Sequence, residues 1–268
     1  MVLTFFSQTS GGCTTSNALA IAMQSALEGN KTVVLDLNFD SYQAGQIAFI
    51  KNEIEVTGLN YYENVGLDAL IRNVLAKTMS KYNIYDIETE IEKNLFYIPK
   101  TIKREYELYI NDISKTFKAI VRALDLYHDV VIIDAGYGIA EINNDIMYES
   151  DIMIANIPQN LSVLKRYIDD LYMDKIHYLI GNYDMASRYS EKRLLSEIRK
   201  IYKKKITISH ISHLAEFSDA IQNTELLRFF YRNENVTEED YNYNFMQSVR
   251  DSFKRICMKY EKMIEVHE

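Results

Sequence analysis

The chain has 268 residues, of which 47% are hydrophobic and 12% aromatic, enough to bury the core of a single globular domain over 1–268. A formal charge of −8 argues against bulk attraction to nucleic acid, and only 2 prolines and 9 glycines leave no segment with a linker composition. No apolar run approaches the ~20 residues of a membrane span and no charged-then-apolar leader is present, so we expect a cytoplasmic protein.

Apolar runs rich in β-branched residues alternate with amphipathic segments along the whole chain. The predicted strands are 2–6, 32–36, 95–98, 130–134, 152–155, 178–180 and 206–208. The predicted helices are 17–27, 67–79, 104–127, 160–172, 190–203 and 214–229, with a C-terminal helix over 241–264. Near-continuous apolar strands are typical of parallel sheets covered on both faces. The order predicts an α/β fold with a doubly wound, mostly parallel sheet flanked by helices, and ligands at the carboxyl ends of the strands.

The segment from Thr9 to Asn17 stands where a phosphate-binding loop would stand. A buried strand leads into it, two glycines form its turn and a helix leads out, which directs backbone N–H groups and a helix N-terminus at an anion. The position of the usual P-loop lysine is Thr15, and the loop contains no lysine at all. We therefore expect an anion site with less positive charge than the motif usually supplies.

Two further strand ends carry acidic residues, Asp36 and Asp134. An aspartate that ends a buried apolar strand is suited to hold Mg²⁺ or its waters beside phosphates. The same placement is common for a helix N-cap or a turn residue, and this alternative stays open for each aspartate.

The set of motifs resembles the deviant Walker A ATPases of the MinD/ParA group, within the larger P-loop class that includes nitrogenase iron protein. That family reads Lys-Gly-Gly-x-Gly-Lys-Ser/Thr-Ser/Thr, which Gly11, Gly12 and Ser16 match. The segment 33–38 resembles the family's strand that ends in Asp-x-Asp, and 131–134 resembles its Walker B strand. The segments 157–162, 181–184 and 210–230 resemble the turn before the next helix, the turn near the base, and the loop and helix on the adenine side.

The resemblance implies a P-loop NTPase-like fold and a weakly bound ATP or ADP with Mg²⁺. It implies nucleotide contacts from Ser10, Gly11, Gly12, Cys13, Thr14, Thr15, Ser16, Asn17, Asn182 and Ile211. It also implies a magnesium site made of Ser16, Asp36 and Asp134.

The departures from the family's pattern concern its charged groups. Ser10 and Thr15 replace the two lysines, Asn38 replaces a water-positioning carboxylate, and Asp40 lies two residues further on. A lost charge-assisted contact to a buried phosphate costs roughly 1.5–3 kcal/mol, and phosphoryl transfer depends on such charges even more. We therefore expect no catalytic residues and slow or absent hydrolysis.

The function that follows is that of a localisation or assembly scaffold with protein partners, for which a homodimer is one open arrangement. Such a role is similar to that of TadZ and CpaE proteins, which help to place pilus machinery. One alternative is an active ATPase with a lysine displaced to Lys100 or Lys103. A second alternative is a DNA-binding partition factor.

Two basic segments bear on these alternatives. Residues 192–205 concentrate lysines and arginines that could contact DNA or anionic lipid, although a solvated helix face is the commoner explanation. The C-terminal helix could dock on the inner face of a membrane, but we favour packing against the sheet.

The 2 cysteines, Cys13 and Cys257, specify neither a disulfide framework nor a metal site, so we expect free thiols. Cys13 also invites a redox interpretation, since a thiol at a helix N-terminus can have a lowered pKa. A small residue tolerated in the loop is the favoured interpretation.

Overall fold

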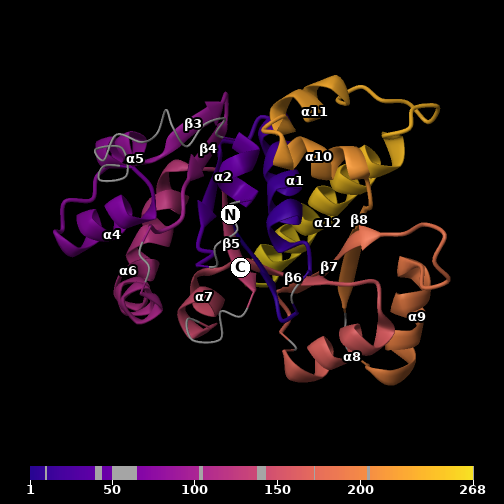
Figure 1. The fold of residues 1–268 in the computed structure, drawn as a ribbon. Helices are drawn as coiled ribbons and strands as arrows, with labels where there is room; N and C mark the ends of the chain where they lie inside the picture. The colour runs from indigo at the N-terminus through magenta and orange to yellow at the C-terminus, as the bar shows by residue number, and fades with distance from the viewer. Residues whose placement is uncertain are drawn as a thin grey trace.

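The computed structural model describes residues 1–9, 11–39, 44–49, 65–102, 105–137, 143–171, 173–203 and 206–267. Its strands are β1 (Val2–Ser7), β2 (Thr32–Asp36), β3 (Thr89–Glu92), β4 (Leu95–Ile98), β5 (Val130–Tyr137), β6 (Ile152–Ile157), β7 (Ile176–Tyr183) and β8 (Thr207–Ser212). They form one 8-stranded sheet in the order β3-β4-β2-β5-β1-β6-β7-β8 (Figure 1). Every neighbouring pair is parallel except β3 with β4, so the predicted mostly parallel sheet is confirmed.

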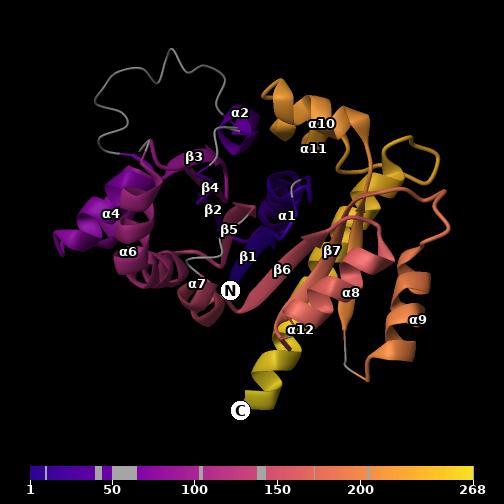
Figure 2. The same ribbon diagram turned by 60° about the horizontal axis from the view of Figure 1, so that its bottom comes forward.

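Helices cover both faces of this sheet. They are α1 (Thr14–Leu27), α2 (Ala44–Phe49), α4 (Leu67–Leu75), α5 (Lys81–Ile87), α6 (Tyr106–Tyr127), α7 (Asn143–Glu149), α8 (Leu161–Asp170), α9 (Glu191–Ile201), α10 (Ala215–Gln222), α11 (Leu226–Arg232) and α12 (Tyr243–His267). One face packs on α1, α10, α11 and α12; the other packs on α4 to α7 toward the β3 end and on α8 and α9 toward the β8 end (Figures 1 and 2).

The alternation of side chains in β5 explains this two-sided core. Val130 and Ile132 join the cluster with α1, whereas Val131 and Ile133 join the cluster with α6. All four are buried, which requires the continuous apolar run seen in the sequence. The sheet is therefore doubly wound.

Several predicted elements differ from the structure. Strand β3 and helices α5 and α7 were not expected, because short segments carry little periodic signal. The left-handed Asn94, with φ of 66°, turns the chain between β3 and β4. The predicted helix 214–229 is divided at Thr224, whose φ of 57° interrupts the helical path. Lys77, with φ of 56°, likewise lies beyond the end of α4, which is shorter than the expected 67–79.

Helix α12 occupies the place of the expected 241–264 helix and packs on the sheet. Its buried apolar side chains are Phe245, Met246, Val249, Phe253 and Ile256. Its polar side chains also bond the open backbone of the edge strand β8: the Ser212 N–H donates to Ser248 Oγ at 3.0 Å, and Ser252 Oγ donates to the His210 carbonyl at 2.9 Å. This contact satisfies groups that an edge strand otherwise exposes. Among the described residues, no helix has the length and apolarity needed to cross a membrane.

Candidate functional site

The glycine loop connects β1 to α1. Gly11 and Cys13 are both left-handed, with φ of 75° and 58°, and Cys13 is the N-cap of α1. The first backbone bond of the helix runs from the Asn17 N–H to the Cys13 carbonyl at 2.9 Å, so the amides of the preceding helical residues have no partner within the helix. Alternating backbone handedness before a helix N-terminus is an anion-binding geometry. Ser10 lies outside the described residues.

Asn17 belongs to the packing of this loop. Its Nδ2 donates to Asn156 Oδ1 on β6 at 2.7 Å, and both side chains are buried. A Cβ on Gly181 would lie 3.0 Å from Asn17 Nδ2 and 2.8 Å from Cys13 Cβ, so β7 approaches the loop at a glycine. Asn17 therefore fixes α1 against β6 and β7.

A buried carboxylate pair lies beside the loop. Asp36 and Asp134 are register partners on β2 and β5, with exposed fractions of 4% and 2%. Asp36 accepts from the Tyr97 hydroxyl at 2.8 Å and from the Asn38 N–H at 2.9 Å. Asp134 Oδ2 accepts from Thr15 Oγ1 at 2.6 Å. The two strand-end aspartates thus meet in one site, as expected from a parallel sheet.

The charges of this pair oppose each other. Burial and the neighbouring Asp36 raise the pKa of Asp134 to about 7, and Thr15 and the Gly136 N–H offset this only in part. Burial also raises the pKa of Asp36, against hydrogen bonds from Asn38 and Tyr97 and the positive charge of Lys100. At neutral pH the pair is therefore suited to share a proton or to take up a cation.

The donor set fits Mg²⁺ in chemistry, because carboxylates and a hydroxyl are the oxygen ligands that this ion accepts. The hydroxyl that the structure joins to the carboxylates is that of Thr15. The half-buried Ser16 makes no side-chain hydrogen bond with the described part of the chain. Within those residues no group of three His, Cys, Asp or Glu side chains is placed to hold a metal, so water or phosphate oxygens would complete the coordination.

Of the two lysines considered as replacements for the missing cation, Lys100 follows β4 next to β2, close enough for its charge to lower the pKa of Asp36. Lys103 and Asp40 lie outside the described residues. Asn38 lies against the left-handed Gly136, where an added Cβ would lie 2.9 Å from Asn38 Cγ.

The two residues expected on the base side lie near the ends of β7 and β8. Asn182 is exposed and left-handed, with φ of 48°, and its Oδ1 is 3.5 Å from His213 Nδ1. Ile211 is 2% exposed and belongs to the core beside α1 and α12, so its side chain faces away from solvent.

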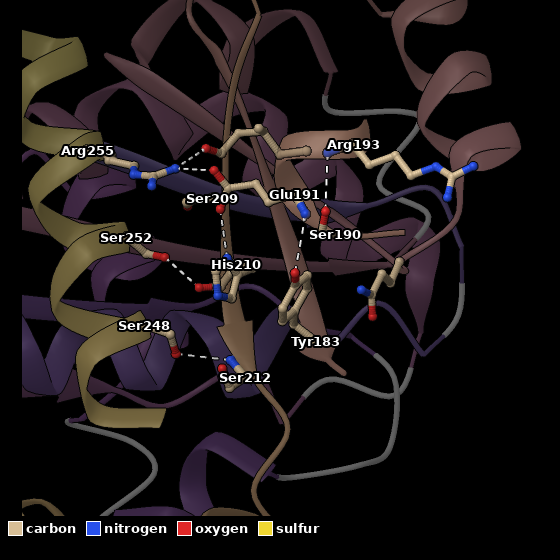
Figure 3. A network of polar contacts seen from close by, with 12 residues as sticks. Tyr183, Ser190, Glu191, Arg193, Ser209, His210, Ser212, Ser248, Ser252 and Arg255 are labelled. Carbon is tan, nitrogen blue, oxygen red and sulfur yellow. Dashed lines mark hydrogen bonds and ion pairs between the residues drawn. The ribbon is translucent and has the colours of Figure 1, made fainter. Parts of the chain in front are cut away.

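A polar cluster ties the outer side of β8 to α9 and α12 around a cleft of about 140 Å³ (Figure 3). Glu191 accepts from Arg255 and pairs with His210 Nδ1 at 2.7 Å, and the His210 ring stacks on Tyr183 with centroids 3.9 Å apart. Burial would raise the pKa of Glu191, but the hydrogen bonds from His210 and Arg255 outweigh it and lower that pKa. The cluster thus stabilises the junction of three elements.

Both cysteines are free thiols, as expected. Burial raises the pKa of Cys13, so the thiol at the start of α1 lacks the lowered pKa of a reactive cysteine. The redox interpretation of this residue is therefore not supported.

Sequence reasoning missed three side chains that shape the site. Tyr97 bonds Asp36, Asn156 bonds Asn17, and Tyr167 of α8 bonds the backbone of the loop at Gln8. Each comes from an element remote in sequence.

A glycine loop between the central strand and the first helix, with carboxylates in the carboxyl-terminal halves of two neighbouring parallel strands, defines a P-loop NTPase-like fold. The structure of a ParA family ATPase from Chlorobium tepidum TLS superposes with a TM-score of 0.67 at 14% identity, over 94% of this chain and 98% of that chain. MinD from Pyrococcus horikoshii OT3, complexed with Mg-ADP, gives a TM-score of 0.66 at 12% identity, over 96% of this chain and 98% of that chain. The MinC:MinD complex of Aquifex aeolicus gives 0.64 at 15% identity, over 96% and 95% of the two chains.

The chain therefore has the fold of the MinD and ParA ATPases at low sequence identity. No family model and no curated protein sequence matches it.

Proposed function

We propose that this chain is a MinD/ParA-like scaffold whose glycine loop binds an adenine nucleotide weakly and hydrolyses it slowly or not at all. It would act by assembling or localising other proteins. It would do so as a homodimer. In the similar MinC:MinD structure, MinD is complexed with another protein, which supports the proposal of protein partners.

One observation carries this proposal. Where the family supplies a lysine, Thr15 directs its hydroxyl to Asp134, and that carboxylate is buried beside a second one. A polyphosphate bound at the loop would meet two carboxylates without the loop's own cations to offset them. Backbone amides still favour an anion, so the balance supports weak binding rather than catalysis.

Mg²⁺ would relieve the repulsion between phosphate and carboxylates. Asp36 and Asp134 would hold the ion or its waters, with a hydroxyl from the start of α1. The ion would supply the positive charge that the loop lacks. Nucleotide binding should therefore depend strongly on the divalent ion.

Calorimetric titration of the nucleotide-free protein with Mg·ATP and Mg·ADP tests the proposal. We expect binding in the range of tens of micromolar or weaker, further weakened in Ser16→Ala and unchanged in Ser196→Ala, an exposed serine on α9. Steady-state hydrolysis that disappears in a folded Asp134→Ala variant would refute the scaffold. Absence of binding at millimolar nucleotide would refute the nucleotide part.

A second candidate function, a working ATPase, is favoured by the position of Lys100. Its charge already acts on Asp36, so it could supply the cation from β4. Hydrolysis lost in Lys100→Gln but retained in Lys93→Gln, an exposed control, would support this candidate.

A third candidate is DNA binding through α9 and the residues that directly follow it. Lys192, Arg193, Arg199, Lys200 and Lys203 are all exposed there, whereas Lys204 and Lys205 lie outside the described residues. Retention on DNA at low salt that is lost on neutralising Lys192, Arg199 and Lys203 would support it.

A further inference from the structure

The underside of the glycine loop is held by two buried side chains, Tyr167 and Ser7, and by the backbone carbonyl of Asn156. Tyr167 of α8 is fully buried, and its hydroxyl accepts from the Gln8 N–H. The same hydroxyl lies 3.1 Å from Ser7 Oγ and 3.4 Å from the Asn156 carbonyl. Ser7 Oγ in turn lies 2.8 Å from the Thr9 carbonyl and 3.0 Å from that of Asn156.

One arrangement of protons fits these distances. Tyr167 accepts from Gln8 and donates to Ser7, Ser7 donates to the Thr9 carbonyl, and the Thr9 N–H donates back to Ser7 Oγ at 3.2 Å. The amides of Gln8 and Thr9 are therefore committed to protein hydroxyls. Among the described residues of the loop, the amides left for an anion are those from Gly11 onward.

Gly12 connects this underside to the anion-binding part of the loop. A Cβ at Gly12 would lie 2.3 Å from Ser7 Oγ and 2.8 Å from Ser7 Cβ, so the backbone of Gly12 rests directly on Ser7. The next residue, Cys13, takes the left-handed conformation that starts α1. A shift of Ser7 would therefore move Gly12 and Cys13 together.

We propose that Tyr167 is a positioning residue for the anion site: its hydroxyl holds residues 7–9 so that Gly12 and Cys13 present their amides to a phosphate. This inference deepens the proposed function and rests on it for the identity of the ligand. Among the described residues, the Tyr167 hydroxyl contacts Ser7, the Gln8 N–H and the Asn156 carbonyl, not the amides of Gly12 or Cys13. It acts through Ser7 and Gly12.

The test removes a single oxygen atom. Tyr167→Phe keeps the ring in the core but leaves the Gln8 N–H without this acceptor. Tyr109→Phe is the matched control for alkylation, because its buried hydroxyl bonds the carbonyl of Leu37, a residue outside the loop, at 2.6 Å. Both changes are made in a Cys257→Ser background, which leaves Cys13 as the one thiol of the chain.

Two readouts report on the loop: the rate of Cys13 alkylation by iodoacetamide, and the dissociation constant of Mg·ADP. In Tyr167→Phe we expect alkylation to be about tenfold faster and Mg·ADP binding about tenfold weaker, with alkylation unchanged in Tyr109→Phe. Ser7→Ala should give changes in the same direction, which covers the case in which Tyr167→Phe does not fold.

The outcomes separate the two proposals. Unchanged alkylation in a folded Tyr167→Phe variant, or an equal change in Tyr109→Phe, would overturn the positioning role. If the parent protein binds no Mg·ADP but Tyr167→Phe still accelerates alkylation, Tyr167 positions the loop and the nucleotide part of the proposed function fails.

Discussion

Replacement of Asp134 by asparagine should stabilise the protein above neutral pH. The pKa of this carboxyl is raised from its ordinary value of 3.8 to about 7 by burial and by Asp36. The difference of about three pH units corresponds to an upper limit of about 4 kcal/mol. Asparagine has nearly the same shape and keeps one acceptor, while the charge that opposes Asp36 is gone.

The sign of the pH dependence follows from the raised pKa. Between about pH 4 and pH 7 the folded protein keeps a proton that the unfolded chain releases, so the free energy of unfolding falls as the pH rises through this window. Asp134→Asn removes this fall in the free energy of unfolding, because asparagine does not ionise. The variant should match the parent protein near pH 4 and exceed it by up to about 4 kcal/mol at pH 8.

Urea denaturation at pH 4, 6 and 8 measures this difference. Asp219→Asn on α10 is the control, because that carboxylate is exposed and its replacement should change stability equally little at each pH. A gain of the same size at pH 4 and pH 8, or no gain at pH 8, would refute the argument that the buried pair resists double ionisation.

Three further predictions concern the loop and α12. Thr15→Lys places an ammonium beside Asp134 and should tighten Mg·ATP binding about tenfold or more by calorimetry, whereas unchanged affinity would mean that the missing charge is not what limits binding. Gly12→Ala should lower the free energy of unfolding by about 1–3 kcal/mol and weaken nucleotide binding, because the new methyl group overlaps Ser7; urea titration and calorimetry check both, and a neutral effect would contradict the close approach. Phe253→Ala should destabilise by about 3–5 kcal/mol in thermal or urea unfolding because this side chain is 1% exposed, and a loss below about 1 kcal/mol would mean that α12 does not pack as an integral part of the core.

The sequence by itself determined the class of fold and the place of the candidate nucleotide site. Continuous apolar runs such as 130–134 predict strands buried on both faces, and the loop after the first strand predicts an anion site at the carboxyl edge of the sheet. These features follow from local periodicity and turn chemistry, which the sequence expresses directly. The two aspartates could be placed at one edge because parallel strands end together.

The tertiary structure decided which side chains meet. The sequence predicted Ser16 as a magnesium-binding hydroxyl, and the structure adds a contact that the sequence did not predict, from the Thr15 hydroxyl at the start of α1 to Asp134 on β5. Tyr97 and Tyr167 reach the site from β4 and α8. Their roles depend on strand register and helix packing between segments far apart in the chain, which no local pattern encodes.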